Sequence, residues 1–99
     1  MIEMGQHPAL ANVARILHAN PGATVRIEGH TDNTGPSEDY NCNLSLGRAK
    51  AVMEHLAALG IAEERLEVLG QCDYEPVASN DTAAGRRKNR RVEFVLIKE

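Results

Sequence analysis

The segment Thr24–Gly29 alternates apolar and polar side chains and lies between two segments with helical periodicity. Its apolar residues, Val25 and Ile27, fall on one face of an extended chain and its charged residues fall on the other. Such alternation is typical of a β-strand with one buried face. On both sides of it apolar residues recur with helical spacing, which predicts helices over residues 8–19 and about 44–59.

Each predicted helix has one apolar stripe and a recognisable boundary. Pro8 suits the first turn of the first helix, where its missing N–H costs nothing, and Asn20-Pro21-Gly22 ends that helix. Gly60 is a common type of C-terminal stop for the second. The stripes are Leu10, Val13, Ala14 and Leu17 in the first helix, and Ala49, Val52, Met53, Leu56 and Leu59 in the second.

Two further strands are predicted, at residues 66–70 and 91–97. The last has apolar residues on both faces, which favours a central position in a sheet. The order helix, strand, helix, strand, turn, strand predicts an α/β (α+β) two-layer sandwich with two helices on one face of the sheet. The chain forms one domain, residues 1–99. Three strands make a thin sheet, so we expect that a strand before Met1 is missing.

Two polar connections are expected to be loops. Residues 31–42 form a long connection, and loops of this length often carry function. Residues 71–90 are mostly loop, with a short helical turn that Asn80 or Asp81 caps and that runs through Gly85.

The charge balance excludes some classes of partner. The net charge of −3 argues against general polyanion binding. Basic residues crowd between Arg86 and Arg91, but aromatic residues make up only 3% of the chain, so nucleic-acid binding is not expected. No apolar run approaches the roughly 20 residues that cross a bilayer, and the first residues do not form a signal peptide.

Asp32 and Arg48 place an acid and a base at either end of one strand-to-helix connection. A carboxylate and a guanidinium that face the same site can hold a ligand with both an ammonium and a carboxylate group. From the residues alone the alternative is simpler: Asp32 caps the loop or the helix, and Arg48 forms a surface ion pair.

His30 and Asp32 have a His-x-Asp spacing that would supply two ligands to a metal. Two ligands are little evidence, so we expect His30 to form hydrogen bonds within its loop and expect no metal or cofactor. The two cysteines, Cys42 and Cys72, have no zinc-site spacing. They are either unrelated small side chains or one disulfide, which would fit a periplasmic setting. Nothing marks a base for Cys42 as a nucleophile.

Several motifs in a fixed order cover most of the chain, about residues 8–97. Together they resemble the OmpA-like peptidoglycan-binding domain. They are Ile27-Glu28-Gly29-His30-Thr31-Asp32, Tyr40-Asn41, Leu44-Ser45, Arg48-Ala49, Gly60-Ile61, Arg65-Leu66, Gly70, Pro76, Asn80-Asp81-Thr82, Gly85-Arg86 and Asn89-Arg90-Arg91-Val92-Glu93.

The resemblance implies a βαβαβ arrangement on a mixed sheet, with the first strand cut short in this chain. In the family, the Asp of Gly-His-Thr-Asp and the Arg of Leu-Ser-x-x-Arg-Ala hold the diaminopimelate of the peptidoglycan stem peptide. These positions are Asp32 and Arg48 here. Asn41 also matches a residue that lines the family's site, and Thr31 and Arg90 are further candidates.

The implied function is non-catalytic binding of peptidoglycan, which would anchor an envelope protein in the periplasm of a Gram-negative-type bacterium, near the outer membrane or cell wall. The parent could be a lipoprotein, a barrel-linked protein or a free periplasmic protein. One alternative is an interaction module, with a homodimer formed through an open sheet edge. A less favoured alternative is a cell-wall hydrolase that uses Asp32 and His30, although the sequence holds no complete catalytic set.

Overall fold

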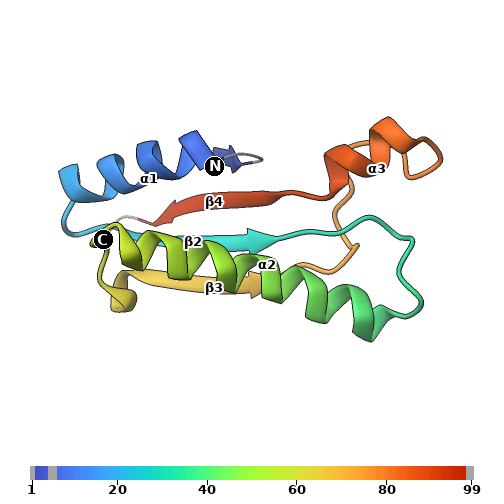
Figure 1. Cartoon of the computed structure of the whole chain (residues 1–99), viewed down its shortest axis with the longest axis horizontal. Coiled ribbons are helices and arrows are strands. Elements are labelled where there is room, and N and C mark those ends of the chain that lie inside the picture. Colours follow the sequence, from blue (N-terminus) through green and yellow to red (C-terminus); the bar gives the residue numbers. More distant parts are fainter. Residues whose placement is uncertain (1, 5–6, 98–99) are drawn as a thin grey trace.

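The structure is a computed structural model that describes the backbone of residues 2–4 and 7–97 and the side chains from residue 10 to residue 97. Its centre is a four-stranded sheet with the strand order β1-β4-β2-β3, whose strands run along the long axis of the molecule (Figure 1). Both β1 and β2 are antiparallel to β4, whereas β3 is parallel to β2. The strands are β1 (Ile2–Met4), β2 (Thr24–Gly29), β3 (Leu66–Gly70) and β4 (Val92–Ile97).

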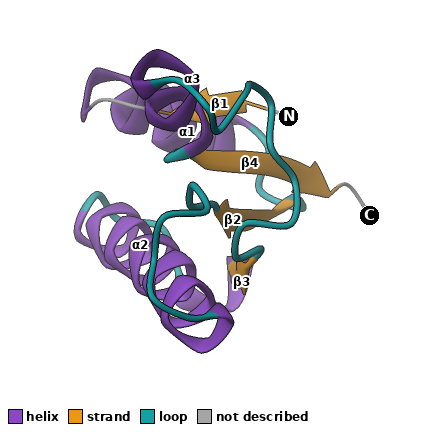
Figure 2. Cartoon of the chain, turned by 90° about the vertical axis from the view of Figure 1, so that its right-hand side faces the viewer, coloured by secondary structure: helices purple, strands orange, loops and turns teal. Residues whose placement is uncertain are grey.

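The helices α1 (His7–Ala19) and α2 (Glu38–Ala58) cover the same face of the sheet (Figure 2). A short 3₁₀ turn, η1 (Glu63–Arg65), precedes β3, and α3 (Ala83–Asn89) precedes β4. This arrangement confirms the predicted α/β two-layer sandwich with two main helices on one face. In the described part of the chain, no helix combines the length and apolar character that a membrane span needs.

The core lies between the two helices and the sheet. Val25, Ile27 and Phe94 supply the strand side of it, with 2%, 0% and 1% of their surface exposed. The predicted stripes of both helices face it, except that Leu59 is 40% exposed because it lies past the end of α2. The helix residues of the core are Leu10, Val13, Ala14 and Leu17 from α1, and Ala49, Val52 and Leu56 from α2, with Met53 packed against them.

The prediction of three strands was wrong, because β1 adds a fourth. Ile2 pairs with Phe94, and Met4 pairs with Val92, so β1 spans three residues of the longer β4. Three residues are too few for a period-2 pattern to be recognised, which is why the sequence pattern did not indicate this strand. With β1 on one side and β2 on the other, β4 has the central position that its apolar residues predicted.

The helix α2 begins at Glu38, six residues before the predicted Leu44. Ser37 caps it, with its side chain accepting a backbone N–H of the first turn. Its buried face begins with the polar residues Asn41 and Ser45, so a search for apolar spacing missed the first two turns. The connection from β2 to α2 is therefore residues 30–37, shorter than predicted.

The turn before β4 also differs from its prediction. It is the helix α3, which extends to Asn89, and its cap is Thr82 rather than Asn80 or Asp81. The Thr82 hydroxyl accepts the N–H of Gly85 at 2.9 Å. This capped helix places the segment that leads into β4 at the same end of the sheet as the connection after β2 (Figure 1).

Candidate functional site

The helix α2 lies unusually close to the ends of β2 and β3. A Cβ atom added at Gly29 would lie 1.9 Å from the backbone oxygen of Ser45, and one at Gly70 would lie 2.8 Å from the Ser45 hydroxyl. Only residues without a side chain permit this approach. Glycines at the ends of two parallel strands therefore let the helix carry its polar residues directly over the strand ends.

Ser45 and a disulfide fasten α2 to the loop after β3. The Ser45 hydroxyl donates to the carbonyl of Cys42 at 2.9 Å and accepts the N–H of Cys72 at 3.0 Å. The structure joins Cys42 and Cys72 in a disulfide. Of the two alternatives for the cysteines, unrelated side chains or one disulfide, the structure has the disulfide.

Backbone hydrogen bonds hold the start of the connection after β2. The N–H of His30 donates to the carbonyl of Arg91, and the N–H of Thr31 donates to the carbonyl of Cys72, both at 2.9 Å. The connection is thus held between the segment before β4 and the loop after β3. Asp32 follows directly, so its position is set by both neighbours.

Asp32 is buried, with 6% of its surface exposed, and both of its carboxylate oxygens are bonded. Oδ1 accepts the backbone N–H of Thr34 at 3.0 Å and the hydroxyl of Thr34 at 2.6 Å, and Oδ2 accepts Nη1 of Arg90 at 2.6 Å. Burial by itself would raise the pKa of Asp32. The two bonds from Thr34, followed by the bond and charge of Arg90, outweigh it and lower the pKa to about 2.

Arg48 lies beside this group without pairing with the acid. Its Nη1 donates to the carbonyl of His30 at 3.0 Å, and no ion pair joins it to Asp32 within the described residues. Burial, followed by the positive charge of Arg90, lowers the pKa of Arg48, and the charge of Asp32 acts in the opposite direction. The charges of two guanidinium groups therefore act at this site beside one carboxylate.

The other predicted site residues lie on this connection or in the first turns of α2. Asn41 is buried, and its side-chain oxygen lies where a Cβ of Gly35 would be, so it faces residues 30–37 from the first turns of α2. Thr31 is 4% exposed, and its hydroxyl has no hydrogen-bond partner among the residues that the structure describes. Tyr40 is half exposed and lies near Arg48.

His30 differs from its prediction. Its ring is 1% exposed, and neither ring nitrogen has a hydrogen-bond partner in the described part of the chain. The nearest acids are Glu28 at 3.9 Å and Glu93 at 4.0 Å from Nε2. Sequence reasoning missed this environment because Glu93 reaches His30 only through the pairing of β2 with β4. It also missed Thr34, although a Thr two residues after an Asp is a common turn signal.

The sequence of this chain is similar to those of known proteins. Residues 2–90 match the sequence model of the OmpA family. The peptidoglycan-binding protein ArfA of Mycobacterium tuberculosis is 49% identical over 87 residues, which are 88% of this chain and 26% of that protein. The outer membrane protein Omp38 of Acinetobacter baumannii is 46% identical over 86 residues, which are 86% of this chain and 24% of that protein. The chain thus spans about a quarter of the length of these relatives.

Solved structures with the same fold include the peptidoglycan-associated lipoprotein of Burkholderia pseudomallei. It has a TM-score of 0.84 and 31% identity, and the match covers 90% of this chain and 75% of that one. The cell wall anchor of the type VI secretion system (T6SS) of Pseudomonas aeruginosa has a TM-score of 0.78 and 40% identity, with 93% of this chain and 66% of that one covered. Each of these two proteins has the same fold as this chain and more than 30% sequence identity with it.

Proposed function

The chain belongs to the OmpA family, and on this premise we propose that it binds peptidoglycan without cleaving it, through the diaminopimelate of the stem peptide. The free end of diaminopimelate carries one ammonium and one carboxylate group. The proposal assigns the ammonium to Asp32 and the carboxylate to Arg48. It places the domain in the periplasm of a Gram-negative-type bacterium, where it would anchor an envelope protein to the cell wall.

The observation that carries the proposal is the charge of the site. One buried carboxylate, Asp32, pairs with the guanidinium group of Arg90, and its charge also acts on Arg48, which does not pair with it in the described part of the chain. The site therefore has an excess positive charge, which a ligand carboxylate would neutralise. The charged state of Asp32 is secured by the low pKa, so the site also keeps a strong acceptor for an ammonium group.

Arg48 has the geometry to receive that carboxylate. Its described hydrogen bond uses one Nη1–H, whereas a guanidinium has five N–H donors. The bond to the carbonyl of His30 fixes the plane of the guanidinium, so that a carboxylate can bind through two parallel bonds. A stem peptide with lysine in place of diaminopimelate lacks the carboxylate and would leave this half-buried charge without its partner.

Arg90 has a second role in the proposal. Its side chain is 39% exposed and occupies Oδ2 of Asp32 in the structure. An incoming ammonium must share or replace this contact. We place Asn41 and Thr31 beside the ligand because they are buried polar residues on the segments that frame the site.

The experiment measures binding of three muropeptides by calorimetry: one with diaminopimelate, one with lysine and one with diaminopimelate amidated at the free carboxylate. The variants Asp32→Ala, Arg48→Ala and Arg48→Lys should each weaken the first by about tenfold to a hundredfold, since a hydrogen bond to a charged group contributes roughly 1.5–3 kcal/mol. The exposed Arg87→Ala in α3 is the matched control and should change nothing. Equal affinity of wild type, Asp32→Ala and Arg48→Ala would refute the proposal.

Release of soluble fragments from purified peptidoglycan tests the non-catalytic part. We expect none from the wild type. Fragments that disappear in Asp32→Ala would instead support the hydrolase.

A second candidate, the homodimer, rests on the sheet edges. The strand β1 pairs with three residues of the six-residue β4, and β3 is an edge strand with Leu69 39% exposed. Exposed edges can pair with another chain. Light scattering over a range of concentrations would test this: a dimer weakened by Leu69→Lys supports it, and a constant monomer mass contradicts it.

A further inference from the structure

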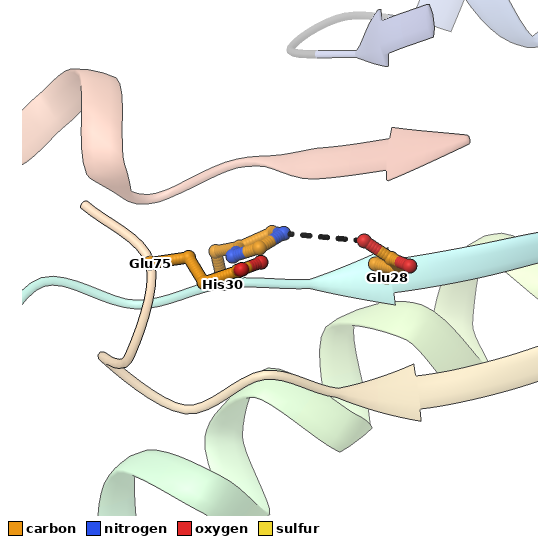
Figure 3. A group of neighbouring side chains, drawn as sticks. All are labelled: Glu28, His30 and Glu75. Carbon is orange, nitrogen blue, oxygen red and sulfur yellow. Dashed lines mark ion pairs between the residues drawn. The ribbon is translucent and has the colours of Figure 1, made fainter. Parts of the chain in front are cut away.

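A second polar cluster lies on the face of the sheet opposite α2 (Figure 3). Glu28 of β2 and Glu93 of β4 are cross-strand partners, and they are only 4% and 6% exposed. Their neighbours Ile27 and Phe94 point into the core, so the two acids point away from it. Two like charges directly opposite each other destabilise a sheet unless other groups compensate.

Arginines compensate each of these acids in part. Arg26 donates to Oε2 of Glu28 at 2.8 Å, which leaves Oε1 directed to His30. Arg91 pairs with Oε2 of Glu93. Among the described residues each carboxylate thus has a guanidinium partner, while the ring of His30 has no hydrogen bond to either acid.

The unpartnered ring of His30 is the unusual feature. Buried polar atoms almost always have a partner, and one without a partner calls for an explanation. Here both ring nitrogens are without one within the described residues, in a side chain 1% exposed. Burial, followed by the charge of Arg91, lowers the pKa of His30. A neutral imidazole with a free lone pair is the form that binds metals.

Glu75 supplies a third ligand from a different segment. Its carbonyl accepts Nη2 of Arg91 at 2.9 Å, which holds the loop after β3 against the start of β4. One oxygen of Glu75, one oxygen of Glu28 and one ring nitrogen of His30 all lie within 4.8 Å of one another. Figure 3 shows the exposed Glu75 reaching the imidazole from this loop, with Glu28 on β2 beyond the other end of the ring.

We propose that Glu28, His30 and Glu75 bind a divalent transition-metal ion, with Zn²⁺ the best fit. One imidazole and two carboxylates suit zinc, whereas Mg²⁺ and Ca²⁺ take oxygen ligands. Zinc–ligand distances of about 2.0–2.2 Å place tetrahedral ligand atoms roughly 3.4 Å apart, so the three atoms must move together by about 1.4 Å at most. Glu75 is exposed and can make this movement. The fourth position is left to water.

The charge of the cluster limits the affinity. Arg91 lies close enough to His30 to oppose any cation there. The charges of Glu28 and Arg26 cancel, and the carboxylate of Glu75 then makes the net charge of this group negative. The site is thus weaker than a four-ligand structural zinc site, and Glu75 is its decisive residue. Asp32 and Arg48 are not among its ligands, so a substitution at Glu75 tests this site separately from the proposed peptidoglycan binding.

The test uses metal-free protein and compares ZnCl₂ with MgCl₂. Calorimetry measures affinity, and ¹⁵N NMR of the imidazole nitrogens identifies the histidine that binds. We expect Zn²⁺ to shift the ring nitrogens of His30 and Mg²⁺ to leave them unchanged. Glu75→Gln should weaken zinc binding at least tenfold. Glu64→Gln, an exposed acid in η1, is the control and should bind as the wild type does.

Both substitutions are at exposed positions, so unfolding temperatures without metal should stay unchanged, which separates loss of the site from loss of the fold. Equal zinc affinity in Glu75→Gln and wild type would overturn the proposal. So would zinc shifts confined to the other histidines, which would mean adventitious binding only.

Discussion

The close approach of Gly29 to α2 leads to a strong prediction for stability. In Gly29→Ala the new Cβ would lie 1.9 Å from the backbone oxygen of Ser45 and 3.3 Å from the backbone nitrogen of Ala49. Cβ atoms essentially never approach another atom closer than 3.0 Å, so the strand and the helix must separate by about 1.1 Å. No flexible side chain can absorb the change, because the clashing atoms are backbone.

The separation removes packing between β2 and the core residues of α2. Overpacking in a core costs about 1–3 kcal/mol, and a backbone clash belongs at the upper end, near 3 kcal/mol. For a domain of this size each kcal/mol lowers the unfolding temperature by about 4–8 °C, so we expect a drop of roughly 12–24 °C.

Gly47→Ala is the matched control, because Gly47 lies on the exposed side of the same helix and its Cβ would meet nothing within 4 Å. Alanine inside a helix is favoured over glycine by about 0.5–1 kcal/mol, so this variant should be more stable than wild type. Urea unfolding followed by circular dichroism measures both changes. A loss below about 1 kcal/mol in Gly29→Ala would refute the reasoning, since it would mean that α2 can move away at little cost.

Three further predictions follow from the contacts around the site. The double variant Cys42→Ser/Cys72→Ser opens a loop with a sequence separation of 30, and we expect it to lose about 3.5 kcal/mol in urea unfolding; an unchanged midpoint would contradict this. Asn89→Ala removes four hydrogen bonds to residues 77–80, which should lower stability by about 3 kcal/mol and speed proteolysis of that loop. Cleavage at the wild-type rate would argue against a role of Asn89 in holding the loop. The pKa of Asp32 is lowered from 3.8 to about 2 in the folded protein, so between these pH values the unfolded state binds more protons than the folded state. The stability that ionised Asp32 contributes to the fold is therefore lost as the pH falls through this range. The difference in stability between wild type and Asp32→Asn should disappear near pH 2, and a constant difference down to that pH would contradict the assignment.

Local patterns predicted most of the secondary structure. The bounds of β2 and β3 agree with the prediction, since alternation and terminal glycines are visible within a few residues. The start of α2 was missed for a physical reason. Its first buried residues, Asn41 and Ser45, are polar because they face the site and the loop after β3 rather than the core.

The site was only partly predictable. Asp32 and Arg48 are 16 positions apart, the first on the connection after β2 and the second in α2, so their proximity follows from one strand and the helix that comes after it. The ion pair of Asp32 with Arg90 joins residues 58 positions apart, and it depends on β4 returning beside β2. The environment of His30 has the same origin, because Glu93 reaches it only across that strand pair.

The orientation of the strands has a mechanical consequence. The molecule measures 41 × 23 × 23 Å and its strands follow the long axis (Figure 1). The segments after β2 and before β4, which carry Asp32 and Arg90, lie at one end of it. The strand β4 runs from that end to Ile97 at the other. If the proposed site binds peptidoglycan, a pulling force between this ligand and Ile97 would act parallel to the strands, and the backbone hydrogen bonds between β4 and β2 are perpendicular to it. These bonds would share the load in shear instead of breaking one after another.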